Sequence, residues 1–164
     1  MLISSRIAAV ILSGALVFLA SDKAAAQASF GAYGVRVSES VNGATAAEGI
    51  GVRAAVSFPV FPLEAYAVAE KVFLDCPTSG CSLWALEAGL NLSLLTVPTV
   101  KPYLTAGVVR RHYEVTSDGT SLEGISFGAG ASAGLPGIRF FLEGRYEFMD
   151  DPYDQFVLRL GVMF

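Results

Sequence analysis

The sequence predicts an all-β protein, an eight-stranded antiparallel up-and-down transmembrane β-barrel preceded by a cleaved helical signal peptide. Two observations carry this prediction. The 164 residues are 53% hydrophobic and only 16% charged, yet beyond the N-terminal segment no stretch has the roughly 18 consecutive apolar residues of a membrane-spanning helix. Turn residues instead divide the chain into segments in which apolar residues recur at every second position, the period of a β-strand.

Residues 1–28 have the three-part plan of a secretory signal peptide. Arg6 precedes an apolar run that is shorter than the ~20 residues of a membrane-spanning helix. Ala26-Gln27-Ala28 is a small-x-small cleavage site, with Ala24-Ala25-Ala26 as a near alternative. We therefore expect export and a single barrel domain at 29–164.

Eight segments have the alternation of strands, and most end at residues that favour turns. The first four are 30–41 before Asn42-Gly43, 50–58 before Pro59, 63–74 before the segment that contains Cys76 and Cys81, and 83–95 before Pro98. The last four are 103–116 before Ser117-Asp118-Gly119, 122–135 before Pro136-Gly137, 138–149 before an acidic segment at 150–154, and 156–164. Crossing a bilayer obliquely takes about 9–11 residues, whereas soluble strands commonly have about 5–6. These lengths favour a membrane barrel.

The connections between the strands differ in composition. Those at 59–62, 96–102 and 136–137 contain proline and no acidic residue. The other four hold the acidic residues Glu48, Asp75, Asp118, Asp150, Asp151 and Asp154. An even number of strands places both termini on one side, which we expect to be periplasmic. Tight turns on that side and polar loops on the other are typical of outer membrane barrels.

The two faces of each strand also differ. In the sixth segment Ile125, Phe127 and Ala129 alternate with Ser126 and Gly128. One face is apolar without ionisable groups, and the other mixes small residues with a few charges. A soluble ligand-binding barrel needs the reverse arrangement, so we expect the apolar face to contact lipid and the polar face to line the lumen.

Charged residues on the polar face predict an ion-pair network inside the barrel. Eight strands enclose a space that side chains just fill, and buried charges are tolerable only when they are paired. We expect structural filling by this network, with a gated conduit as the alternative. Its expected members are Arg36, Arg53, Glu70, Glu87, Arg111, Glu143, Arg145 and Arg159.

Three motifs lie in the last part of the chain. They are Pro102-Tyr103-Leu104-Thr105-Ala106-Gly107, Phe141-Leu142-Glu143-Gly144-Arg145-Tyr146, and a terminal strand whose apolar positions are Phe156, Leu158, Leu160, Val162 and Phe164. Together they resemble the small eight-stranded outer membrane barrels, the OmpA-like and OmpX-like β-barrel domains of the porin family, with their Pro-Tyr-x-x-x-Gly strand, Phe-x-Glu-x-Arg-Tyr strand and terminal aromatic.

This resemblance implies a monomer in the outer membrane of a Gram-negative-type bacterium, in contact with outer membrane lipid and lipopolysaccharide. It also implies that the outer membrane assembly machinery and periplasmic chaperones read the last strand, with Phe164 as its terminal aromatic. The implied role is structural or surface interaction, with a narrow porin-like channel or a lipid A-modifying enzyme as alternatives.

Cys76 and Cys81 are the only cysteines. Exported proteins meet oxidising conditions, so we expect a disulfide between them. Two cysteines cannot complete a structural zinc site.

The only histidine, His112, lies near Glu114, Ser117 and Ser121, but proximity in sequence is weak support for catalysis. We expect no catalytic residue, cofactor or metal. The net charge of −4 disfavours a nucleic-acid partner.

Overall fold

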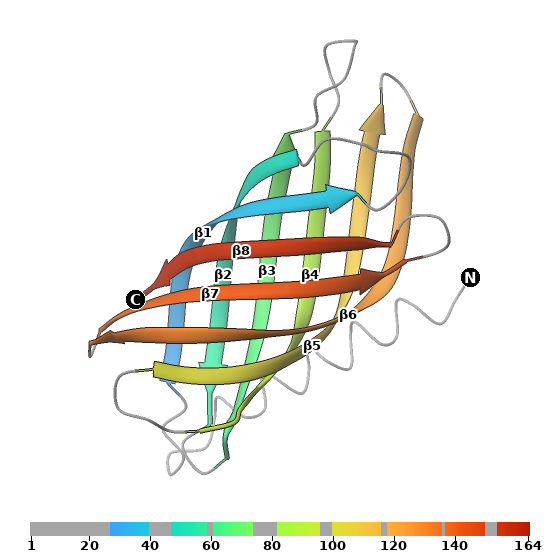
Figure 1. Ribbon diagram of the computed structural model, residues 1–164. Coiled ribbons are helices and arrows are strands. Elements are labelled where there is room, and N and C mark those ends of the chain that lie inside the picture. Colours follow the sequence, from blue (N-terminus) through green and yellow to red (C-terminus); the bar gives the residue numbers. More distant parts are fainter. Residues whose placement is uncertain are drawn as a thin grey trace.

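The computed structural model describes residues 27–39, 47–58, 61–73, 82–95, 100–115, 118–135, 137–149 and 154–164. They form one closed antiparallel barrel in which each strand pairs with the next and the last pairs with the first (Figure 1). The strands are β1 Gln27–Glu39, β2 Ala47–Ser57, β3 Leu63–Phe73, β4 Ser82–Ser93, β5 Val100–Val115, β6 Asp118–Leu135, β7 Ile138–Phe148 and β8 Gln155–Met163. The prediction of an eight-stranded up-and-down barrel is therefore confirmed.

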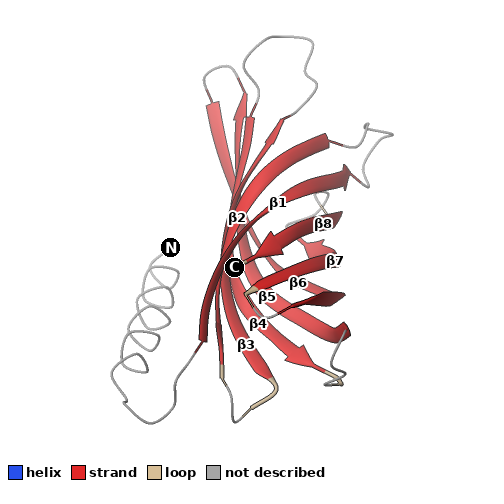
Figure 2. Cartoon of the chain, turned by 90° about the vertical axis from the view of Figure 1, so that its left-hand side faces the viewer, coloured by secondary structure: helices blue, strands red, loops and turns tan. Residues whose placement is uncertain are grey.

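The strands run obliquely around the barrel, as Figure 2 shows. The register gives the stagger. A row of paired residues that starts at Ala28 on β1 passes through all eight strands and returns to β1 at Ser38, ten residues further along. A fixed stagger of this kind accompanies the strand tilt that closes a barrel. Each row of paired residues is therefore displaced along the strands as it passes around the barrel.

The barrel has two unlike ends. The connections β2–β3, β4–β5 and β6–β7 lie at the end where β1 begins and β8 finishes, which we call the turn end. The other connections lie at the opposite end, the loop end. Within the described residues, no helix is long and apolar enough to cross a membrane.

The strand boundaries follow the expected ranges closely. The largest difference is at β6, which begins at Asp118 rather than at residue 122, because Asp118 and Gly119 pair with the end of β5 instead of forming a turn. β1 begins at Gln27, inside the predicted signal peptide. Residues 1–26 lie outside the described residues, so the signal peptide stays a prediction. The alternative cleavage site at 24–26 would leave all of β1 in the mature chain.

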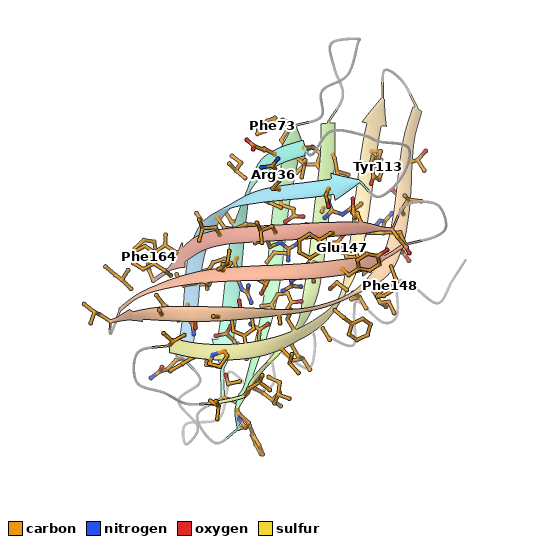
Figure 3. All side chains as sticks on the ribbon, viewed as in Figure 1. Arg36, Phe73, Tyr113, Glu147, Phe148 and Phe164 are labelled. Atoms are coloured by element: carbon orange, nitrogen blue, oxygen red, sulfur yellow. The ribbon has the colours of Figure 1, made fainter. Side chains whose placement is uncertain are left out.

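The alternation of faces matches the prediction on most strands. Large apolar side chains cover the outside, including Ile50, Leu86 and Leu160, each at least 60% exposed. Figure 3 shows Phe148 and Phe164 pointing away from the barrel wall and Glu147 pointing into the barrel.

The orientation of Arg36 on β1 was predicted wrongly. Arg36 lies on the exposed face, and Tyr33, Val35 and Val37 are the inward residues. The ring of Tyr33 occupies the space above Gly51, where a Cβ would collide with it. Because successive residues point to opposite faces, an inward Tyr33 turns Arg36 outward.

The outer face also carries more charge than predicted. Beside Arg36, the outward residues near the strand ends at the loop end include Glu48, Lys71, Arg110, His112 and Glu123. The expectation of a face without ionisable groups therefore holds only away from the loop end. Long charged side chains near an interface can keep their heads in water while their stems cover apolar surface.

Candidate functional site in the lumen

Eight charged side chains are buried inside the barrel, each with 4% or less of its surface exposed. They are Arg53 on β2, Glu70 on β3, Glu87 on β4, Arg111 on β5, Glu143, Arg145 and Glu147 on β7, and Arg159 on β8. We call them the lumen network. Four cations oppose four anions, so the network is electrically neutral.

Arg159 is the hub of the lumen network, because it reaches all four carboxylates. Its Nη2 and Nε lie 3.0 Å from Glu70 Oε2, and its Nη1 lies 2.8 Å from Glu87 Oε2. Longer contacts join Nη1 to Glu143 Oε1 at 3.5 Å and Nη2 to Glu147 Oε1 at 4.0 Å. A buried guanidinium with so many acceptors keeps its charge compensated from several strands at once.

The other three arginines each join two carboxylates. Arg111 binds Glu147 through two nitrogens, at 2.7 and 3.0 Å, and Glu70 at 3.0 Å. Bidentate pairs of this kind are among the strongest charge-assisted hydrogen bonds.

Arg145 and Arg53 complete the set of pairs. Arg145 Nε lies 2.6 Å from Glu143 Oε1, and its Nη1 contacts Glu87. Arg53 Nη1 lies 3.1 Å from Glu143 Oε2, and its Nη2 is 3.8 Å from Glu64. Every arginine of the network therefore links carboxylates from different strands.

Neutral donors complete the carboxylate shells. The phenols of Tyr33, Tyr66 and Tyr103 donate to Glu70, Glu87 and Glu143 at 3.0, 2.8 and 3.0 Å. Ser126 donates to Glu87 at 2.6 Å, and Gln155 donates to Glu147 at 2.8 Å. Buried carboxylates with both ionic and neutral donors are the arrangement that a low-polarity interior tolerates.

A polar cavity of about 380 Å³ lies at the turn end. Glu64 organises its wall by accepting from Arg139, Ser57 and Asn91 at 2.9, 3.0 and 2.9 Å. Arg53 lines the same cavity, so the lumen network forms its inner wall. The cavity is a vestibule in front of the part of the lumen that the network occupies.

The structure brings seven of the eight expected lumen residues together and leaves Arg36 outside. The predicted network omitted Glu147, although the two-residue spacing places it on the same polar face as Glu143 and Arg145. It also missed the tyrosines, because only the closed barrel shows that their hydroxyls reach the carboxylates.

His112 faces outward on β5, and its Nδ1 lies 2.9 Å from Ser121 Oγ on β6. The side chain of Glu114 and residue Ser117 lie outside the described part. Within the described residues, no group of three or more His, Cys, Asp or Glu side chains could hold a metal ion.

The remaining predicted sites are placed as follows. Cys76 and Cys81 lie outside the described residues, so their disulfide stays a prediction. Phe156, Leu158, Leu160 and Phe164 share the exposed face, with Val162 half-buried beside them. The backbone of Phe164 exchanges two hydrogen bonds with Phe30, which extends the β1–β8 seam to the end of the chain.

No family model matches the chain, and no curated protein matches it. Solved structures do. Neisserial surface protein A shares 17% identity over 83% of this chain and 92% of that one, with a TM-score of 0.56. The attachment invasion locus protein Ail of Yersinia pestis shares 17% identity over 85% of this chain and 97% of that one, with a TM-score of 0.54. The N-terminal β-barrel domain of Pseudomonas aeruginosa OprF shares 15% identity over 85% of this chain and 98% of that one, with a TM-score of 0.56.

These matches, together with the register and the faces, define the class. The chain has the fold of the small eight-stranded outer membrane β-barrels. Identities this low carry the fold and nothing more specific.

Proposed function

We propose that this protein is an integral outer membrane β-barrel with a side-chain-filled lumen, and that its role is structural or one of surface interaction. The observation that carries the proposal is the inverted polarity of the barrel. Val52, Leu160 and their neighbours are exposed on the outside, while four arginines and four glutamates are buried inside. An apolar surface this extensive is rare on soluble monomers and typical of barrels in lipid.

The same proposal includes the route and the surroundings of the protein. The chain is exported by a cleaved signal peptide in a Gram-negative-type bacterium, guided by periplasmic chaperones and inserted as a monomer by the assembly machinery. Its partners are outer membrane lipid and lipopolysaccharide. The predicted Cys76–Cys81 disulfide forms in the oxidising periplasm, and thiol labelling of the folded, non-reduced protein tests it.

Cell fractionation combined with gel mobility tests the proposal. The protein should appear in the outer membrane fraction, and the unboiled sample should migrate differently from the boiled one, because a closed barrel resists detergent until it is heated. Recovery in the soluble periplasmic fraction would instead indicate a ligand-binding barrel and would reject the proposal.

We further propose that the chain is not an enzyme and binds no cofactor. One observation favours the lipid A-modifying alternative, namely the 2.9 Å contact between His112 Nδ1 and Ser121 Oγ on the outer face. A serine beside a histidine can act as an activated nucleophile. Mass spectrometry of lipid A from cells that overproduce the protein or its His112→Ala variant decides between a non-enzymatic barrel and an enzyme. A change in lipid A that the wild-type protein causes and the His112→Ala variant does not would establish the enzyme.

A further inference from the structure

A groove of about 850 Å³ lies on the outer face of the barrel over β1. Its floor is made of small residues, Ala32 and Gly34, and a Cβ built on Gly34 would meet no atom within 4 Å. The residues paired with them on β2 and β8 are larger and form its two walls, namely Ile50, Val52, Leu160 and Val162. The volume is in the range of about 300–1,000 Å³ that ligand pockets occupy.

The loop end of the groove is cationic and aromatic. Lys71 and Trp84 line it, and the Lys71 ammonium lies 5.0 Å from the centre of the Trp84 ring. Arg36 is the next outward residue after Gly34 on β1, and Glu48 lies opposite it on β2. Among the described side chains, these two cations and one carboxylate give this end a net positive charge.

This combination selects the chemistry of the occupant. Apolar walls suit a hydrocarbon chain, whereas Lys71 and Arg36 suit an anionic group held at the level where Trp84 lies. Tryptophan is enriched at the membrane–water interface, and basic residues there attract anionic lipid head groups. A neutral solute would not pair with the two cations, and a free anion would not cover the apolar walls.

We propose that this groove binds a phosphorylated lipid, with an acyl chain along Ala32 and Gly34 and the phosphate at Lys71 and Arg36. The inference rests on the proposed function, because it needs the outer face to lie in a bilayer. It adds that one stretch of the outer face binds anionic lipid more tightly than zwitterionic lipid.

Trp84 is the only tryptophan and lies beside the groove, so its fluorescence reports the lipids there. The full chain is folded into vesicles of phosphatidylcholine and phosphatidylglycerol in which either lipid carries brominated, quenching acyl chains. The quenching of Trp84 should correspond to an affinity for phosphatidylglycerol that is about five-fold higher than that for phosphatidylcholine. This is the effect expected of one net basic charge near the surface. The ratio between the two lipids cancels any change in the emission of Trp84 itself.

Variants separate the parts of the groove. Lys71→Gln and Arg36→Gln should each lower the preference for phosphatidylglycerol over phosphatidylcholine, and Glu48→Gln should raise it. Gly34→Val should lower this preference by filling the floor of the groove. Two matched controls should leave it unchanged. Arg110→Gln removes an outward cation that Glu123 already pairs at 3.9 Å, and Ala106→Val enlarges an exposed outward residue on β5, away from the groove.

Two failures are distinguishable. A chain that shows no mobility shift in vesicles would overturn the proposed function and this inference with it. A chain that inserts but quenches equally with both lipids, or keeps its preference in the Lys71→Gln, Arg36→Gln double variant, would overturn the inference alone.

Discussion

At the scale of single residues, the stability of the lumen depends on charge balance. Arg159 contacts four carboxylates, all of which are buried. Removing one partner from a buried ionic set leaves an uncompensated charge, which costs more than the intact set contributes. The network therefore behaves as a unit.

Arg159→Met should destabilise the barrel by about 3–5 kcal/mol, because four glutamates would face three arginines. Urea unfolding of the protein in vesicles measures this. The matched control is Arg159→Met combined with Glu70→Gln, which restores neutrality at the residue that Arg159 contacts twice at 3.0 Å. A double variant as unstable as the sum of the two single variants would show that the charges act independently.

Reversing a carboxylate should be more harmful than removing it. Glu143→Lys places a cation beside Arg53, Arg145 and Arg159, all within 3.5 Å of the present carboxylate oxygens. We expect the folded band on unboiled gels to disappear at a lower temperature than for Glu143→Gln. Equal heat resistance of the two variants would contradict the network.

Glycines opposite the tyrosines provide space inside the wall. The ring of Tyr66 lies over Gly89 and Gly107, and a Cβ at Gly89 would collide with its hydroxyl and with the Ala106 carbonyl oxygen. Gly89→Val should therefore destabilise the barrel by about 1–3 kcal/mol through overpacking. Gly34→Val is the control, because its Cβ would meet no atom within 4 Å; equal losses in urea unfolding would refute the explanation.

At the scale of elements, β1 and β8 form the seam that closes the barrel. Their register runs from Gly31 with Met163 to Glu39 with Gln155, and the backbone of Phe164 extends it to Phe30. The side chain of Phe164 is 64% exposed, so the seam depends on its backbone rather than its ring. A requirement for the ring would therefore arise during assembly rather than in the folded state.

Phe164→Ala should lower the amount of barrel in the outer membrane of cells while leaving refolding into vesicles nearly unchanged. The comparison of membrane-fraction yield with in vitro gel mobility measures the difference. Phe140→Ala is the matched control, since Phe140 is 60% exposed and also lies near the turn end. Equal yields for both variants in cells would argue against a terminal assembly signal.

At the scale of the whole molecule, the lumen is filled rather than open. Six strands contribute charged side chains to the network, and beyond the vestibule of about 380 Å³ these side chains share the interior with buried apolar ones such as Val37, Val72 and Leu83. An eight-stranded barrel has room for little more than its own side chains. The narrow-channel alternative would require the network to separate, against several ion pairs at once.

The wild-type barrel should therefore show no steady ion conductance in planar bilayers. The same preparation must show the heat-dependent mobility shift, which proves that folded protein was added. Stepwise currents that depend on protein concentration would contradict a filled lumen and favour the channel.

Much of this architecture follows from local pattern. Strand number and most strand ends were predictable because alternation and turn residues are properties of neighbours in the chain. Segments such as 125–133 on β6 show their outward face directly. The orientation of β1 was not predictable in this way, since Arg36 lies between Val35 and Val37 and polarity alone does not say which of the two faces turns inward.

The sequence by itself determined an antiparallel barrel of eight strands, its apolar outer face and most of the charges inside it, because each depends on a period of two residues. Only the tertiary structure decided that Arg36 faces outward, that Glu147 joins the network, and that Arg159 meets all four carboxylates. The physical reason is closure. The ten-residue stagger between Ala28 and Ser38 sets which rows of β2 to β8 meet across the lumen, and no single strand carries that information.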